Sequence, residues 1–138
     1  RRIAVGMIAL LDTHAFLWAA IEPAKLSSRV RKTIVDPSHE IHLSTISFWE
    51  IALKFALGKL ILTGCTPDDL VPVARRMGLV IAAPSAEEAA GFHRLPRSAH
   101  KDPFDRMLIW QCLRRDWTLL TKDRGLDAYA ALGLKTSW

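Results

Sequence analysis

The sequence predicts a three-layer α/β/α domain in which helices cover both faces of a mainly parallel, roughly five-stranded sheet. Two observations predict this class. Short apolar runs alternate along the chain with amphipathic stretches of helical length. The run at residues 8–12 is apolar up to its final carboxylate, which is typical of a central strand that is buried on both faces.

Capping and stop signals then place each element in order. A helix at residues 13–21 ends before Glu22-Pro23, and Ser27 or Ser28 caps the next helix. Gly58 and Gly78 end two later helices, and Asp102-Pro103 begins the strongest one. Further strands are expected at residues 40–44, 79–82, 117–121 and, marginally, 134–136. Further helices are expected at residues 28–35, 47–57, 67–77, 86–93, 103–115 and 123–131.

Composition indicates one soluble domain. The chain has 138 residues, half of them hydrophobic and 24% charged. We expect a single domain at residues 7–138, with residues 1–6 a remnant ahead of the native start at Met7. No apolar run is long enough to span a membrane, and two cysteines without metal or redox spacing fit a reducing cytoplasm. The net charge of +5 modestly favours anionic partners.

Three aspartates are expected at one edge of the sheet. Asp12 ends the first strand, Asp123 follows the strand at residues 117–121, and Asp105 lies in the first turn of a helix that begins at the same edge. Ligand sites of open parallel sheets lie beyond the carboxyl ends of the strands. Each aspartate also has a purely structural explanation, because strand ends and first helical turns favour acids as caps and dipole partners.

Glu50 has no equally good structural explanation. It shares a helical stripe with Ile46, Leu53 and Leu57, so its carboxylate projects from an apolar face. Lys54 lies four residues on and either pairs with Glu50 or extends into water. If Glu50 meets the three aspartates, carboxylates about 5 Å apart repel by roughly 3 kcal/mol at an effective dielectric constant near 20. A Mg²⁺ ion, or Mn²⁺ in its place, would compensate that repulsion and suit hydrolysis of a phosphodiester.

Four motifs together resemble those of the PIN-domain ribonucleases, specifically the VapC-type toxins of bacterial toxin–antitoxin pairs. The motifs are LLDTHAFLW (residues 10–18), SFWEIALKFALGKL (residues 47–60), HKDPFDRMLIWQ (residues 100–111) and LLTKD (residues 119–123). The resemblance implies a divalent-metal-dependent endoribonuclease that is dimeric and inhibited by a cognate antitoxin. The acidic set that it implies as catalytic residues and metal ligands is Asp12, Glu50, Asp105 and Asp123, with Thr121 and Thr13 in support.

Basic residues surround two of these acids. Eight Lys or Arg residues lie between Arg94 and Arg124, against four aspartates. Such a run is usually a solvated face, but here it could form a track for the RNA backbone. The candidates for phosphate contacts are Lys101, Arg106, Lys122 and Arg124. Arg106 could equally pair with a carboxylate.

Two other functions compete with this interpretation. Asp12 could accept a phosphoryl group in a phosphotransfer or phosphatase domain. Alternatively, the acidic pocket could belong to a catalytically idle module that docks a cationic partner. The histidines at positions 14 and 100 have no zinc-site spacing and are expected to form hydrogen bonds around the site or within loops. The tryptophans are expected mainly as core or interface residues, with base stacking a lesser alternative.

Overall fold

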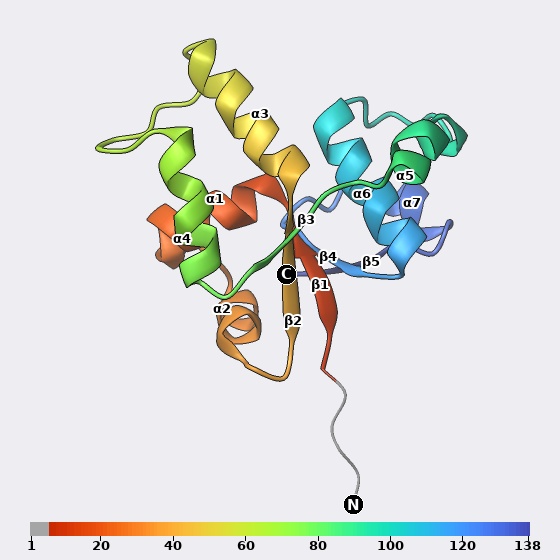
Figure 1. The fold of residues 1–138 in the computed structure, drawn as a ribbon. Coiled ribbons are helices and arrows are strands. Elements are labelled where there is room, and N and C mark those ends of the chain that lie inside the picture. The colour runs from red at the N-terminus through yellow and green to blue at the C-terminus, as the bar shows by residue number, and fades with distance from the viewer. Residues whose placement is uncertain (1–5) are drawn as a thin grey trace, which may run out of the picture.

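A five-stranded, all-parallel sheet forms the centre of the molecule in the computed structural model, which describes residues 6–138 (Figure 1). The strand order is β3-β2-β1-β4-β5. In the central pairings, Leu11 lies opposite Leu43 of β2 on one side and Leu120 of β4 on the other. The strands are β1 (Ile8–Leu11), β2 (Glu40–Ser44), β3 (Val80–Ala82), β4 (Thr118–Leu120) and β5 (Lys135–Ser137).

Helices cover both faces of the sheet and confirm the predicted three-layer class. Figure 1 shows α1 to α4 on one side of the sheet and α5 to α7 on the other. Successive β1 residues serve both layers, because Ala9 and Leu11 belong to the first core cluster and Leu10 to the second. The helices are α1 (Thr13–Ile21), α2 (Ser28–Val35), α3 (Thr45–Ala56), α4 (Leu70–Arg76), α5 (Ala86–Gly91), α6 (Pro103–Arg115) and α7 (Asp127–Ala130).

Most predicted elements are present with small shifts at their ends. Helix α3 begins two residues earlier than predicted, because the Ser44 hydroxyl accepts a hydrogen bond from the Ile46 amide and caps it. Gly58, with a φ of 72°, follows α3 as expected of a left-handed stop. The predicted helix at residues 67–77 is divided into a 3₁₀ turn at Pro67–Asp69 and α4.

The helix predicted at residues 123–131 is wrong in its first part. Helix α7 spans only Asp127–Ala130, and Asp123 lies in a turn after β4. The Asp123 carboxylate accepts a hydrogen bond from the Gly125 amide at 2.7 Å, so the side chain stabilises a turn that competes with helix. Asp123 therefore caps no helix, and its carboxylate remains at the edge of the sheet.

Two expectations concern the limits of the chain and its environment. The proposed remnant at residues 1–6 falls almost wholly on residues 1–5, which lie outside the described residues. Within residues 6–138, no helix has the length and apolar character that a membrane span requires. Both cysteines are free thiols, and burial raises the pKa of Cys112 to about 12, so Cys112 supplies no thiolate at neutral pH.

Candidate active site

Asp12 is fixed at the junction of β1 and α1. Its amide donates to the Leu120 carbonyl at 3.1 Å, which extends the β1–β4 ladder by one bond. Its carboxylate accepts from the Ala15 amide at 2.7 Å and so caps α1. Burial raises the pKa of Asp12, against the lowering effect of the Thr121 hydroxyl and the Ala15 amide. The carboxylate thus has a structural role as a cap and is also held in a partly desolvated position.

Thr121 connects Asp12 with Asp123. Its hydroxyl accepts a hydrogen bond from the Asp123 amide at 3.1 Å. The same hydroxyl lies near enough to the Asp12 carboxylate to lower the pKa of Asp12. The Asp123 side chain is 44% exposed, in contrast with the buried Thr121. One buried hydroxyl after β4 therefore lies beside Asp12 and holds the backbone of Asp123.

Asp105 lies in the first turn of α6, where Asp102 performs the capping. The Asp102 carboxylate accepts from the amides of Phe104 and Asp105 at 2.9 and 3.1 Å, as predicted. This leaves the Asp105 carboxylate free to face the pocket. Burial is the largest influence on the pKa of Asp105 and raises it, and the Asp102 charge raises it further. Asp105 is therefore more than a dipole partner at a helix terminus.

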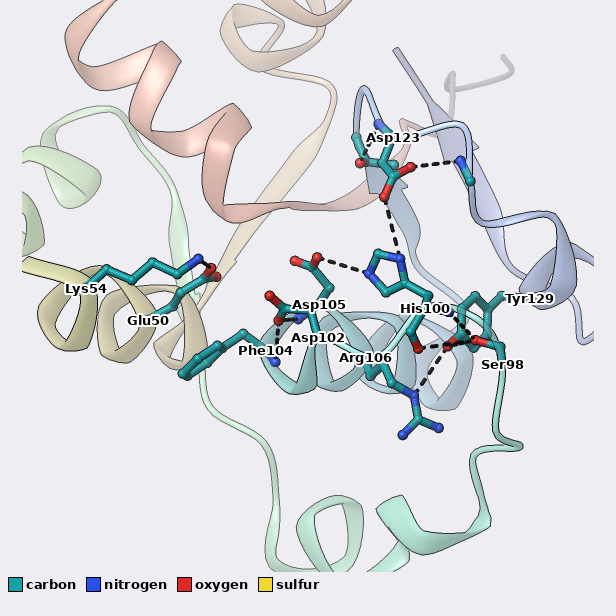
Figure 2. Close-up of polar contacts among 12 residues, drawn as sticks. Glu50, Lys54, Ser98, His100, Asp102, Phe104, Asp105, Arg106, Asp123 and Tyr129 are labelled. Atoms are coloured by element: carbon teal, nitrogen blue, oxygen red, sulfur yellow. Dashed lines mark hydrogen bonds and ion pairs between the residues drawn. The ribbon is translucent and has the colours of Figure 1, made fainter. Parts of the chain in front are cut away.

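His100 lies between two of the acids. Figure 2 shows its imidazole between Asp105 and Asp123, with Nε2 at 3.1 Å from Asp105 and Nδ1 at 3.8 Å from Asp123. The Ser98 hydroxyl accepts from the His100 amide at 3.2 Å and also bonds Tyr129. The sequence indicated a hydrogen-bonding histidine here but not its partners, because the spacing from Asp123 depends on two loops.

The three aspartates line one pocket of about 280 Å³ at the carboxyl edge of the sheet. His14 and His100 complete its polar wall, and side chains such as Leu108 and Leu119 form its apolar floor. Glu50 lies close enough for its charge to raise the pKa of Asp12 and of Asp105. Acids from β1, α3, α6 and the loop after β4 are therefore gathered in one small region.

Glu50 projects inward from α3 and is only 3% exposed, as its predicted apolar surroundings required. The predicted stripe is wrong for Leu53 and Leu57, which are 39% and 59% exposed because the C-terminal end of α3 extends past the core. Lys54 forms an ion pair with Glu50 Oε2 across one helical turn (Figure 2). Of the two predicted positions for Lys54, pairing with Glu50 is therefore the one observed, and extension into water is not. Glu50 Oε1 is buried without a hydrogen-bond partner in the described structure. Thr13 holds the neighbouring turn, since its hydroxyl donates to Ser47 at 2.9 Å and joins α1 to α3.

The four candidate phosphate contacts lie in different surroundings. Lys122 and Arg124 are exposed on either side of Asp123, and Lys101 is exposed beside His100. Arg106 is half-buried, and its guanidinium donates to the Leu95 and Pro96 carbonyls at 3.1 and 3.0 Å. Arg106 also donates to the Tyr129 hydroxyl at 3.3 Å, so it braces the loop ahead of α6 (Figure 2). Among residues 6–138 it forms no ion pair with an acid.

The chemistry of these donors fits a hard divalent cation. The candidate ligands are carboxylate oxygens, the type that Mg²⁺ and Mn²⁺ prefer, and Glu50 Oε1 is a buried oxygen without a partner. As positioned across residues 6–138, no three His, Cys, Asp or Glu side chains already surround a common point as a metal cage would. Lys54 instead supplies a positive group beside Glu50, and the His100 imidazole lies against Asp105.

Comparison with known proteins identifies the family. The PIN domain model matches residues 9–132, and the chain therefore belongs to the PIN domain family. It is 30% identical over 129 residues to Ribonuclease VapC22 of Mycobacterium tuberculosis, covering 94% of this chain and 97% of that relative. This confirms the VapC-type resemblance that the motifs indicated.

Solved structures share the fold. VapBC2 from Rickettsia felis, bound to a promoter DNA fragment, matches with a TM-score of 0.68 at 16% identity over 95% of this chain and 98% of the other. FitAcB from Neisseria gonorrhoeae matches with a TM-score of 0.61 at 20% identity, and the match covers 94% of this chain and 96% of the other. VapBC from Salmonella typhimurium, bound to DNA, matches with a TM-score of 0.63 at 14% identity, and the match covers 96% of this chain and 97% of the other. At these identities the likeness establishes the architecture alone.

Proposed function

We propose that this protein is a divalent-metal-dependent endoribonuclease and the toxin of a toxin–antitoxin pair. The observation that carries the proposal is the convergence of Asp12, Asp105 and Asp123 in one pocket, beside the buried Glu50. This convergence occurs in a PIN-domain chain whose curated relative is named a ribonuclease. The acids reach the pocket from separate parts of the chain, which the capping of individual elements does not require.

Asp12, Asp105 and Asp123 would hold the metal, with Glu50 as a further ligand or as an organiser of water. When bound, Mg²⁺ or Mn²⁺ supplies Lewis acidity and lowers the pKa of a coordinated water. The chain's own residues perform the remaining tasks. Thr121 holds the Asp123 backbone and lies beside Asp12, and Thr13 positions the α1–α3 junction. His100 lies where it can hold a proton between Asp105 and Asp123.

RNA phosphates would approach along the basic side of the pocket. Lys122 and Arg124 flank Asp123, and Lys101 follows His100, so all three are near the acids and exposed. Positive charge at the rim raises the local concentration of a polyanion and offsets its repulsion by the acidic pocket.

We also propose an antitoxin partner, a homodimer and a cytoplasmic location. The partner is supported by the solved structures that share the fold, which are those of VapBC2, FitAcB and VapBC. The homodimer is supported by exposed apolar residues on α3 and at its C-cap, among them Trp49, Leu53 and Leu57. The absence of a membrane-spanning helix among residues 6–138 is compatible with the location.

The test is RNA cleavage by the purified protein with and without Mg²⁺ or Mn²⁺. We expect cleavage that EDTA abolishes, and a loss of about a hundredfold or more in Asp12→Asn and Asp105→Asn, because each removes a charged ligand. Asp116→Asn is the matched control, since Asp116 is an exposed residue with left-handed backbone at the end of α6, which Asn tolerates. Unchanged melting temperatures would show that the variants remain folded.

Two results would reject the proposal. Full cleavage by both pocket variants would exclude the acids as catalytic residues. Stable phosphorylation of Asp12 by acetyl phosphate, without cleavage of RNA, would instead support the phosphotransfer alternative. Calorimetry with Mn²⁺ tests the idle docking module. That alternative predicts no binding of Mn²⁺, whereas the ribonuclease proposal predicts binding that Asp123→Asn abolishes.

A further inference from the structure

A second groove adjoins the acidic pocket. It has a volume of about 410 Å³, within the range of about 300–1,000 Å³ that is usual for ligand sites. Thr121, Asp123 and Leu126 line both cavities, so the loop after β4 is their shared wall. A strand of substrate that leaves the acidic pocket over this loop would enter the groove directly.

Three cations line this groove: Arg29 from the first turn of α2, and Lys122 and Arg124 from the loop after β4. All three residues are exposed, and none takes part in the ion pairs found among residues 6–138. Arg29 also lies where the positive end of the α2 dipole disfavours a cation. Two acids, Asp123 and Asp127, share the lining, so the groove retains one positive charge and has three donors without acidic partners.

A row of aromatic rings runs alongside the same path. His14 lines the acidic pocket, and its ring centroid is 5.8 Å from that of Trp18. Trp18 is in turn 5.8 Å from Trp138, which lines the groove. Lys122 Nζ lies 5.7 Å from the Trp18 ring. Trp18 lines neither of these two cavities, and both tryptophans are half-buried against the first core cluster, so Trp138 is the ring that the groove presents. Positive charge interleaved with aromatic rings is the surface that single-stranded nucleic acid recognises.

We propose that this groove binds the stretch of single-stranded RNA next to the cleavage position. Arg29, Lys122 and Arg124 contact its phosphates, and Trp138 stacks against one of its bases. The proposal rests on the proposed ribonuclease function and extends it, because it adds Arg29 and Trp138 to the substrate contacts. It also gives the RNA a direction, from the aspartates across the loop at residues 121–126 toward the C-terminal end of β5.

The test measures equilibrium binding of a short fluorescein-labelled single-stranded RNA by anisotropy, in EDTA so that no metal-dependent cleavage occurs. The groove variant is Arg29→Gln/Lys122→Gln/Arg124→Gln. Its control is Lys59→Gln/Arg75→Gln/Arg76→Gln, which loses the same charge at exposed positions outside the groove. We expect the dissociation constant of the groove variant to rise about tenfold or more, and its slope of log affinity against log salt to fall by about 2.

Trp138→Leu provides a second readout that does not depend on charge. We expect about a tenfold loss of affinity with an unchanged salt slope, because the loss is of base stacking. Equal weakening by the groove variant and the control would overturn the proposal, as would wild-type affinity in the groove variant. These outcomes differ from a failure of the ribonuclease proposal, in which the wild type does not cleave RNA when Mg²⁺ or Mn²⁺ is added.

Discussion

Glu50 shows how the charge of a single residue is accommodated in the interior. Its side chain is 3% exposed, whereas that of its partner Lys54 is 37% exposed. The hydrogen bond that Lys54 donates to Glu50 is the largest influence on the pKa of Lys54, and it raises that pKa. The charges of Asp102 and Asp105 raise it further. The lysine head therefore serves as the counterion for a carboxylate that water hardly reaches.

Removal of the Lys54 charge should destabilise the fold through Glu50. We expect Lys54→Met to lower the free energy of unfolding by about 1–2 kcal/mol, at the lower end for buried pairs because water reaches the lysine. Urea denaturation measures this change. Lys59→Met, at an exposed position beyond α3, should change it by less than about 0.5 kcal/mol.

The double variant Lys54→Met/Glu50→Gln isolates the pair. It should be more stable than Lys54→Met alone, because it leaves no unpaired buried charge. If both variants are equally unstable, Lys54 contributes packing rather than charge compensation.

The sequence could not decide these partners. The spacing of Glu50 and Lys54 allowed a pair but equally allowed Lys54 to extend into water, and only the packing of α3 beside α1 and α6 settles the choice. His100 is the stronger case, because its two acids lie five and twenty-three residues away. Asp12, Asp105 and Asp123 were predictable as neighbours because parallel strand ends and helix starts share one edge.

At the scale of elements, one ion pair joins α5 to α6. Arg115 donates from Nε to Glu88 Oε2 at 2.7 Å, and it donates from Nη2 to the Ala83 carbonyl at 2.8 Å. Trp110 of α6 donates from Nε1 to the Glu88 carbonyl at 2.8 Å. Glu88 additionally closes the capping box of α5 with Ser85. The hydrogen bond from Arg115 is the largest cause that lowers the pKa of Glu88.

This ion pair should make stability depend on pH. Because the pKa of Glu88 is lower in the folded state than its ordinary value of 4.5, its contribution is present above that value and is lost as pH falls through the folded pKa. We expect Glu88→Gln, which keeps the capping box, to cost about 1–2 kcal/mol at pH 7 and much less near pH 3. Urea denaturation at both pH values measures the difference.

Lys135 and Asp116 form an exposed pair that serves as the control, with side chains 54% and 87% exposed. Lys135→Gln should change stability little at either pH. A cost for Glu88→Gln that stays constant down to pH 3 would contradict the assigned role of its charge.

Element boundaries were most predictable where a cap and a stop lie in the sequence itself. Helix α1 has both Asp12 and Glu22-Pro23, and residues 13–21 match the prediction. The region after β4 has carboxylates that suit either a helix start or a side-chain turn. In the structure, the Gly125 amide donates to the Asp123 carboxylate and forms a turn in place of the predicted helix start. A prediction based on helical caps alone could not anticipate this turn.

At the scale of the whole molecule, α3 carries apolar surface away from the core. Figure 1 shows its C-terminal end standing clear of the other layers. Trp49, Leu53 and Leu57 recur every four residues and are 60%, 39% and 59% exposed. Trp49 also meets Phe104 edge to face, with ring centroids 5.1 Å apart, so the stripe continues onto α6. An apolar stripe of this kind is typical of a face that another chain covers.

The proposed homodimer should depend on this stripe. We expect light scattering after gel filtration to give a dimer mass for the wild type and a monomer mass for Leu53→Glu/Leu57→Glu. The buried carboxylates would raise the dissociation constant about a hundredfold or more. Val35→Glu is the control, because Val35 is 79% exposed on α2 and lies outside the stripe. A monomeric wild type, or a dimeric double variant, would contradict the proposal.

The two sides of the acidic pocket are built from different kinds of structure. On one side, the hydrogen bond from the Asp12 amide to Leu120 ties the pocket to the sheet. Asp12 extends the ladder between β1 and β4, and the Thr121 amide extends the ladder between β4 and β5 by donating to the Ser137 carbonyl. The interior of the sheet is the part of an α/β domain that opens last. His100 instead belongs to a segment between Arg94 and Pro103 that contains neither helix nor strand. We therefore expect the amides of residues 95–102 to exchange with deuterated water faster than the Asp12 amide, and the access of solvent to Asp105 and Asp123 to vary without any unfolding of the sheet.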